Sequence, residues 1–303
     1  MYAKVDRLMR LNYLLKKKVD LEPANISNLR PIHHVCRYQL SDTIKLFIDK
    51  KVNLECESKN YKLRPIHIAC QYNTVDVIKL LLDENVNLEC EDSDKCLPIH
   101  YACQFQSLDT IKLFLEKNIC LESENIKNMR PIHFACLYQN SDTVKLFIEK
   151  NVDLESMNCN KMRPIHFARQ HKLSDMTKLL IDNNVDLQCS DIKGMQPIHY
   201  VCKNDSGEIV QLLIQSKVDL ECETKYKSRP IHFVCKYGNA ESIIYLAKQK
   251  INLDCINNFG EKPIDIARKK LHNNITLSYL GKIVIDTHTD IVNCQLLILR
   301  HFR

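Results

Sequence analysis

The stretch Arg64-Pro65-Ile66-His67-Ile68-Ala69-Cys70 recurs with small changes along most of the chain. Its proline sets the spacing and stands at Pro31, Pro65, Pro98, Pro131, Pro164, Pro197, Pro230 and Pro263. The first interval is 34 residues and the other six are 33, and each of the first seven prolines is followed by Ile and His. A period this strict indicates a repeat architecture.

Each period has the same physical plan. The proline suits the first position of a helix, where its missing N–H has no cost. A small residue follows four places later, at Val35, Ala69, Ala102, Ala135, Ala168, Val201 and Val234, and lets neighbouring helices approach closely. After a polar break, a second run such as residues 41–49 has apolar residues at helical spacing. The period ends in a Val-Asn/Asp-Leu-Glu-Cys segment, as at 52–56, whose alternation predicts an extended hairpin arm.

Helix, turn, helix and hairpin at this period resemble the ankyrin repeat. The family's Thr-Pro-Leu-His-x-Ala pattern has its counterpart here in Arg-Pro-Ile-His-x-Ala/Val. The resemblance implies an all-α solenoid with short β-hairpin loops, stacked as a single one-dimensional domain. We expect a partial N-terminal repeat at 1–30, seven full repeats over 31–262, a degenerate repeat at 263–281 and a non-repeat tail at 282–303.

Two departures from the family pattern affect stability. The capping Thr is replaced by arginine at Arg30, Arg64, Arg130, Arg163 and Arg229, and arginine cannot accept the N–H bonds at a helix start. Acidic residues in register with them predict surface ion pairs: Glu55 with Arg64, Glu122 with Arg130 and Glu155 with Arg163. The family's glycine after the second helix becomes Asn85, Asn118, Asn151, Asn184, Lys51, Lys217 or Lys250. Asparagine tolerates the left-handed backbone conformation and lysine does so less readily, so we expect the array to be less stable than an idealised one.

The composition and the motifs that the sequence lacks argue against several classes of function. The net charge of +6 is modest, and no base-stacking motif accompanies it, so we expect no nucleic-acid partner. The sequence has no apolar run long enough for a membrane span. It also has no nucleophile elbow, phosphate-binding loop, zinc-protease motif or dinucleotide fingerprint. We therefore expect no enzymatic activity and no cofactor.

Fifteen cysteines without a signal peptide favour a reducing compartment, the cytoplasm or the nucleus. Most of them lie in two repeating registers, where cysteine acts as a small hydrophobic residue. His-x-x-Cys recurs six times and leaves a zinc site as an alternative, although no Cys-x-x-Cys supplies a second ligand pair. In the tail, Asp286, His288 and Asp290 would share a face of a strand, either as a solvated face or as metal ligands.

The resemblance implies a binding surface on the concave face, built from first helices and hairpin tips. Two registers there are rich in residue types that interfaces favour. The predicted partner-binding residues are Tyr38, Tyr72, Phe105, Tyr138, Tyr237, Leu63, Met129, Met162, Arg64, Arg130 and Arg163. We expect a monomeric, non-enzymatic scaffold that binds a protein. A self-associating structural array and a substrate-recruiting adaptor for an enzyme complex are the alternatives.

Overall fold

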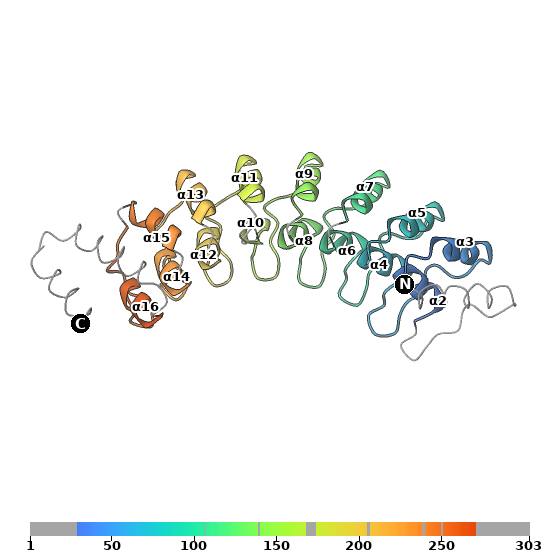
Figure 1. The fold of residues 1–303 in the computed structure, drawn as a ribbon, viewed down its shortest axis with the longest axis horizontal. Coiled ribbons are helices and arrows are strands. Elements are labelled where there is room, and N and C mark those ends of the chain that lie inside the picture. Colours follow the sequence, from blue (N-terminus) through green and yellow to red (C-terminus); the bar gives the residue numbers. More distant parts are fainter. Residues whose placement is uncertain are drawn as a thin grey trace, which may run out of the picture. The chain divides into compact units, whose positions relative to one another are not determined.

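The computed structural model describes residues 29–105, 107–138, 140–167, 174–204, 207–237, 240–249 and 251–270. Its helices come in pairs that repeat along the chain (Figure 1). The first helices are α2 (Pro31–Arg37), α4 (Pro65–Gln71), α6 (Pro98–Gln104), α8 (Pro131–Leu137), α10 (Pro164–Phe167), α12 (Pro197–Lys203), α14 (Pro230–Tyr237) and α16 (Pro263–Lys270). The second helices are α3 (Ser41–Asp49), α5 (Val75–Asp83), α7 (Leu108–Glu116), α9 (Ser141–Glu149), α11 (Ser174–Asp182), α13 (Gly207–Gln215) and α15 (Ala240–Ala247).

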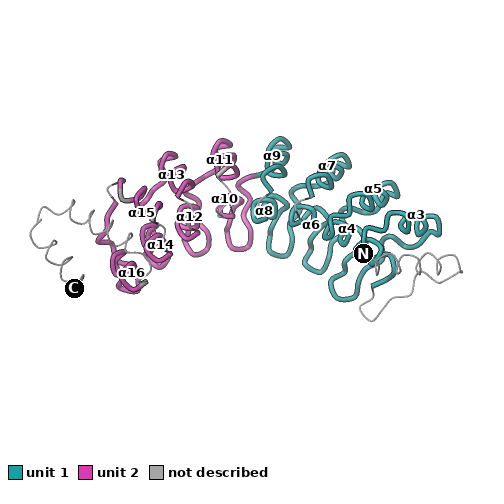
Figure 2. Tube along the Cα trace, viewed as in Figure 1, with its two compact units in different colours: residues 1–153 teal, residues 154–303 magenta. Residues whose placement is uncertain are grey.

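The chain divides into two compact units, Met1–Asp153 and Leu154–Arg303, coloured separately in Figure 2. Unit 1 contains α2 to α9, and unit 2 contains α10 to α16. Within each unit, first helices pack on first helices, as α4 does on α2 and α6, and second helices pack on second helices, as α5 does on α3 and α7. Each unit is therefore a stack in which a helix pair contacts its sequence neighbours.

The core lies between the helix layers and repeats with the sequence. Ile32, Ile66 and Ile99, which follow the motif prolines, are at most 1% exposed. Phe47 and Phe114 of the second helices are fully buried. The predicted small residues of the first helices are buried wherever the structure describes them. None of the helices in the described part of the chain has the length and hydrophobicity needed to span a bilayer.

Every first helix in the described residues begins at its motif proline, as the sequence predicts. The residue before the proline is extended, with a φ of −89° and a ψ of 162° at Arg64. The Arg64 carbonyl accepts the first hydrogen bond, from the His67 N–H at 3.0 Å. The arginine side chain does not cap the helix, so the arginines act elsewhere in the fold.

The expected extended hairpin arm is not found, because no described residue lies in a β-strand. Side chains take the arm's N–H groups instead: Asn53 Oδ1 accepts from the Glu55 N–H at 2.8 Å, and Glu55 Oε1 from the Asn87 N–H at 2.7 Å. The described residues at the family's glycine position all adopt the left-handed backbone, the two lysines as well as the asparagines: Lys51, Asn85, Asn118, Asn151, Asn184 and Lys217. Lys250 lies outside the described residues.

Candidate functional site

The motif histidine links successive loops from a buried position. At His67, Nδ1 accepts the Arg64 N–H at 3.1 Å, and Nε2 lies 3.2 Å from the carbonyl oxygens of Cys90 and Cys96. Because a backbone N–H can only donate, Nδ1 carries no proton and the Nε2–H donates to the carbonyls. Burial lowers the pKa of His67, His100 and His199 to about 4. The histidine is thus a neutral structural bridge.

The same ring geometry recurs throughout the described repeats. The bond from the preceding amide to Nδ1 is 3.0–3.1 Å long at His33, His67, His100, His133, His166, His199 and His232. The Cys90 and Cys189 sulfurs lie 3.9 Å from a motif histidine, and burial raises the pKa of each thiol to about 12. Among the described residues, no three His, Cys, Asp or Glu side chains are grouped to hold a metal ion.

The charge pairs predicted from the sequence are present, and their glutamates also bond to the next repeat. Arg64 donates to Glu55 at 2.7 Å, while the other oxygen of Glu55 accepts the Asn87 N–H of the next repeat. Arg130 pairs in the same way with Glu122, which accepts the Asp153 N–H at 3.0 Å. Arg163 pairs with Glu155 and Arg229 with Glu221. The glutamates therefore connect adjacent repeats, and the arginines hold them in place.

Each loop is closed by a buried polar residue that the sequence reasoning missed. Asp92 Oδ1 accepts the N–H groups of Asp94 and Cys96 at 2.8 and 2.7 Å. An equivalent residue closes the other described loops: Asn125, Asn158, Asp191, Thr224 and Asn257. The sequence does contain a signal for this residue, because Asp, Asn or Thr stands six residues before each of these prolines. Side chains of these types accept hydrogen bonds from backbone N–H groups a few residues further along the chain. In the first loop Ser58 takes this place, and the extra residue of the 34-residue interval lies between Ser58 and Leu63.

Neighbouring loops are also joined directly. The Ser93 N–H donates to the Tyr61 carbonyl and the Ile126 N–H to the Asp94 carbonyl, both at 2.9 Å. In unit 2, the Lys225 N–H donates to the Lys193 carbonyl at 2.9 Å. The loop tips are therefore fixed relative to their neighbours, so that each unit presents a preformed surface along them.

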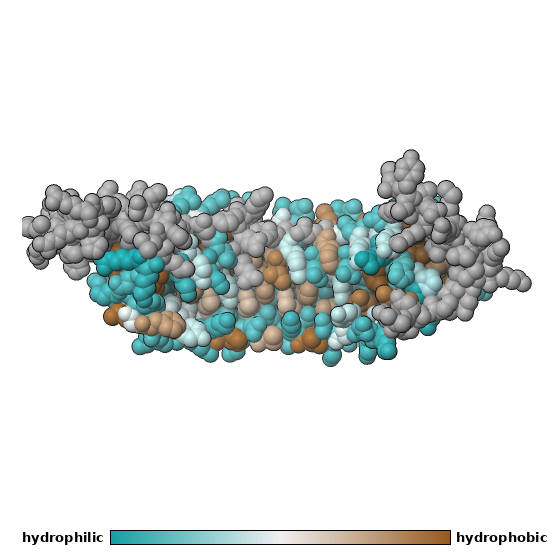
Figure 3. All heavy atoms as spheres, turned by 60° about the horizontal axis from the view of Figure 1, so that its bottom comes forward, coloured by the Kyte–Doolittle hydropathy of each residue, from teal (hydrophilic) through white to brown (hydrophobic). Residues whose placement is uncertain are grey.

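Four of the five predicted residues of the aromatic register are exposed. Tyr38, Tyr72, Phe105 and Tyr237 are between 37% and 43% exposed, and Tyr138 is half-buried. Four of these residues lie in unit 1, where each directly follows a first helix, from α2 to α8. In the view that turns the loop side forward, hydrophobic residues lie among hydrophilic ones (Figure 3). The register forms a row of partly exposed rings in unit 1.

The expectation that the Leu and Met register is exposed is wrong for two members. Met129 and Met162 are each only 9% exposed, whereas Leu63 is half-buried. Met162 packs within unit 2, where its sulfur lies 3.9 Å from the Tyr200 hydroxyl of the next repeat. The arginines Arg64, Arg130 and Arg163 have side chains only 22–23% exposed and are held by carboxylates.

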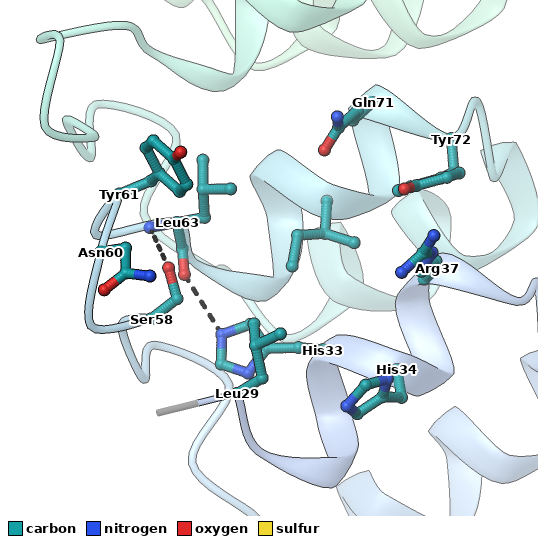
Figure 4. A pocket seen from close by; sticks show the side chains of 11 residues that line it. Leu29, His33, His34, Arg37, Ser58, Asn60, Tyr61, Leu63, Gln71 and Tyr72 are labelled. Atoms are coloured by element: carbon teal, nitrogen blue, oxygen red, sulfur yellow. Dashed lines mark hydrogen bonds between the residues drawn. The ribbon is translucent and has the colours of Figure 1, made fainter. Parts of the chain in front are cut away.

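The aromatic row borders a groove in unit 1 with a volume of 220 Å³. This α2–α4 groove is lined by Leu29, Arg37, Tyr61, Leu63, Ile68 and Tyr72, among others (Figure 4). The Arg37 guanidinium lies 5.1 Å from the Tyr72 ring centroid and 5.6 Å from that of Tyr38. On the loop side, Ser58 Oγ accepts the Leu63 N–H and the His33 ring meets the Leu63 carbonyl, which fixes the groove wall.

Several sequence predictions fall outside the described residues. They are most of the partial repeat at 1–30, the small residue Ala168, and the tail with Asp286, His288 and Asp290.

A family model described as ankyrin repeats (3 copies) matches residues 3–92, 32–128, 99–191, 132–224 and 198–289. These matches span most of the sequence, and the chain belongs to the ankyrin-repeat family. The crystal structure of the human ASB11 ankyrin repeat domain is similar, with a TM-score of 0.65 and 20% sequence identity, over 72% of this chain and 97% of that chain. At this identity the likeness establishes the fold alone. A comparison with curated proteins gave no match.

Proposed function

We propose that this chain is a non-enzymatic scaffold that binds a protein partner through the aromatic row and the α2–α4 groove of unit 1. The row of Tyr38, Tyr72, Phe105 and Tyr138 carries the proposal. Burying aromatic side chains of this size is favourable, so leaving them partly in water has a cost. The core between the helix layers is packed by other residues and does not need these rings. Partly exposed tyrosines on a rigid support are typical of the centre of a protein interface.

The remaining features of unit 1 support recognition of a protein surface. Arg37 beside two tyrosine rings combines charge with aromatic area, as interface centres often do. The loops and helix ends are held by backbone and side-chain bonds, so little conformational entropy is lost on binding. The proposed binding surface does not include Met129, Met162, Arg64, Arg130 and Arg163. The two methionines are buried, and the three arginines are paired with glutamates of the fold.

Two further parts of the proposal concern the compartment and the oligomeric state of the chain. All fourteen described cysteines are free, and all but Cys120 and Cys159 are buried, which suits a reducing compartment such as the cytoplasm or the nucleus. We propose a monomer, which light scattering coupled to size exclusion tests. A concentration-dependent dimer that is lost on changing the aromatic row would favour the self-associating array instead.

The experiment on the binding surface compares two triple variants of the tagged full chain in capture from native cells. Tyr72→Ala/Phe105→Ala/Tyr138→Ala should lose the captured partner. Its matched control, Leu80→Ala/Leu113→Ala/Leu146→Ala, trims half-buried apolar residues on the second helices α5, α7 and α9. The control should capture the same partner as the unchanged chain. Equal capture by the aromatic variant, with circular dichroism showing an intact fold, would refute the placement.

A further inference from the structure

A second groove, in unit 2, differs in chemistry from the α2–α4 groove. It lies along α12, α14 and α16 and the loops before them, and has a volume of 480 Å³. Four lysines line it, Lys193, Lys203, Lys236 and Lys269, against the single carboxylate of Glu261. Burial lowers the pKa of His232, so that ring adds no charge at neutral pH. This lysine groove therefore carries a local excess of positive charge.

Three of the lysines occupy one register, six residues after the motif proline. Along the described repeats this register reads Arg37, Gln71, Gln104, Leu137, Lys203, Lys236 and Lys269. The first helices of unit 1 after α2 are neutral there, whereas α12, α14 and α16 each carry a lysine. The repeat fold does not require a charge at this position, because it also accepts glutamine and leucine. The lysines are thus a property of the lysine groove and not of the scaffold.

Two of these ammonium groups form no salt bridge with a carboxylate in the part of the chain that the structure describes. Among the residues that the structure describes, Lys203 and Lys236 form no ion pair, and their Nζ atoms each lie 5.9 Å from the centroid of the Tyr237 ring. Lys269 differs, since its Nζ lies 2.8 Å from Glu261 Oε1. Lys203 and Lys236 are held near an aromatic face with their charge still available to an anion.

The loop side of the groove adds an apolar shelf. Tyr226 and Phe259, at the tips of consecutive loops, stack with their ring centroids 6.2 Å apart and an interplanar angle of 23°. They are 51% and 70% exposed, and Phe259 is the more exposed of the two. Hydrophilic and hydrophobic side chains lie next to one another at the α16 end of the loop face (Figure 3). An apolar side chain of a ligand would gain by covering this shelf.

The lysine spacing fits an extended peptide. Packed helices lie about 8–10 Å apart, so equivalent lysines on α12 and α14 repeat at about that distance. An extended chain in the polyproline II conformation has three residues per turn and rises about 3.1 Å per residue, so acidic side chains three residues apart share one face and recur about every 9 Å. A carboxylate at every third position would therefore meet successive lysines.

The surrounding charges favour a peptide over a nucleic acid. Glu221 and Glu223 lie on the loop before α14, where they pair with Arg229. A nucleic acid carries a phosphate at every nucleotide and gains by covering unpaired basic groups along its length. In the lysine groove itself it would meet the Glu261 carboxylate, whereas a peptide can carry its acidic residues only where the lysines stand.

We infer that unit 2 binds an extended acidic segment of a protein partner in the lysine groove, with carboxylates on Lys203 and Lys236 and an apolar side chain on the Tyr226–Phe259 shelf. This inference rests on the proposed function as a protein-binding scaffold, but it concerns a different surface.

The test measures binding of a fluorescein-labelled synthetic peptide to the full chain by fluorescence anisotropy. The peptide has glutamate at every third position and a leucine between two of them. A matched peptide has glutamine in place of glutamate, and a single-stranded oligonucleotide is the third probe. The peptide with glutamate should bind at least about ten-fold more tightly than the glutamine peptide, and more weakly as salt rises.

The protein variants assign the site. Lys203→Gln/Lys236→Gln installs the residue that α4 and α6 carry at the same register, and it should weaken peptide binding about ten-fold. The control Lys178→Gln/Lys248→Gln removes the same charge from exposed positions of unit 2 outside the lysine groove and should bind like the unchanged chain. Phe259→Ala should weaken binding of the leucine peptide more than that of a peptide with alanine in its place.

Three outcomes would overturn the inference: equal binding of the two peptides, unchanged binding by the Lys203→Gln/Lys236→Gln variant, or tighter binding of the oligonucleotide than of the peptide. These results are independent of partner capture by the aromatic row. Failure of the unit 1 variants to change capture would refute the proposed function's placement while leaving the lysine groove intact.

Discussion

Mild acid should destabilise the fold through its buried histidines. In the unfolded chain these rings have an ordinary pKa of 6.5, whereas burial lowers it to about 4 in His67, His100 and His199. The unfolded chain therefore binds more protons as the pH falls below 6.5, and stability present above about pH 7 is lost progressively toward pH 4. At pH 5 each such ring lowers the free energy of unfolding by about 2 kcal/mol relative to pH 7.5. His67 and His100 together therefore lower the free energy of unfolding of unit 1 by about 4 kcal/mol.

The geometry explains why protonation is costly. A proton on Nδ1 would meet the amide that now donates to it, as at His100, where the Leu97 N–H lies 3.0 Å away. The assay is urea unfolding followed by far-ultraviolet circular dichroism at pH 7.5 and pH 5, at one ionic strength, because the chain has no tryptophan to report fluorescence. At pH 5 carboxylates of ordinary pKa are still mostly ionised, so the histidines dominate the difference.

One variant separates this effect from other titrations. His100→Gln removes a titrating ring, so it should be less stable than the unchanged chain at pH 7.5 while losing about 2 kcal/mol less on going to pH 5. Equal unfolding midpoints of the unchanged chain at the two pH values would refute the reasoning. So would an undiminished pH difference in the variant.

Three further predictions concern the loops and the thiols. Gly194→Ala should lower the thermal unfolding midpoint more than Gly260→Ala does. Both glycines have φ near +70°, but only at Gly194 would the added Cβ meet backbone, at 3.0 Å. Equal losses in the two variants would contradict this. Glu122→Ala should lower the unfolding free energy by about 1 kcal/mol, because it removes the acceptor that joins two repeats, and the loss should shrink at high salt. Among the described cysteines, Cys120 and Cys159 should react first with a thiol reagent, as mass spectrometry of the modified peptides would show, and early modification of a buried thiol would contradict the packing.

The sequence predicted the helix layers because their signals are local. A proline at the first helical position and apolar residues at helical spacing act within one repeat, so the helix starts at Pro65 and Pro98 follow directly. The pairing of Glu55 with Arg64 was also predictable, since the two residues lie nine positions apart in one loop. Its second bond, to the Asn87 N–H of the next repeat, was not, because it depends on how repeats stack.

The errors have a related cause. An alternating Val-Asn-Leu-Glu-Cys segment is compatible with a strand, yet here side chains take its N–H groups and no β-ladder forms among the described residues. Met129 and Met162 were expected on the surface because they belong to the recognition loops. The burial of Met162 involves the next repeat, because its sulfur lies beside the Tyr200 hydroxyl. The lysine register was readable in the sequence, but its meaning required the groove and the shelf of Tyr226 and Phe259.

The central claim is that a protein partner binds the aromatic row of unit 1, and partner capture by the two triple variants tests it most directly. Tyr72→Ala/Phe105→Ala/Tyr138→Ala should lose the partner while keeping its helical circular dichroism, and Leu80→Ala/Leu113→Ala/Leu146→Ala should retain it. Undiminished capture by the folded aromatic variant, or loss in the second-helix variant alone, would contradict the claim.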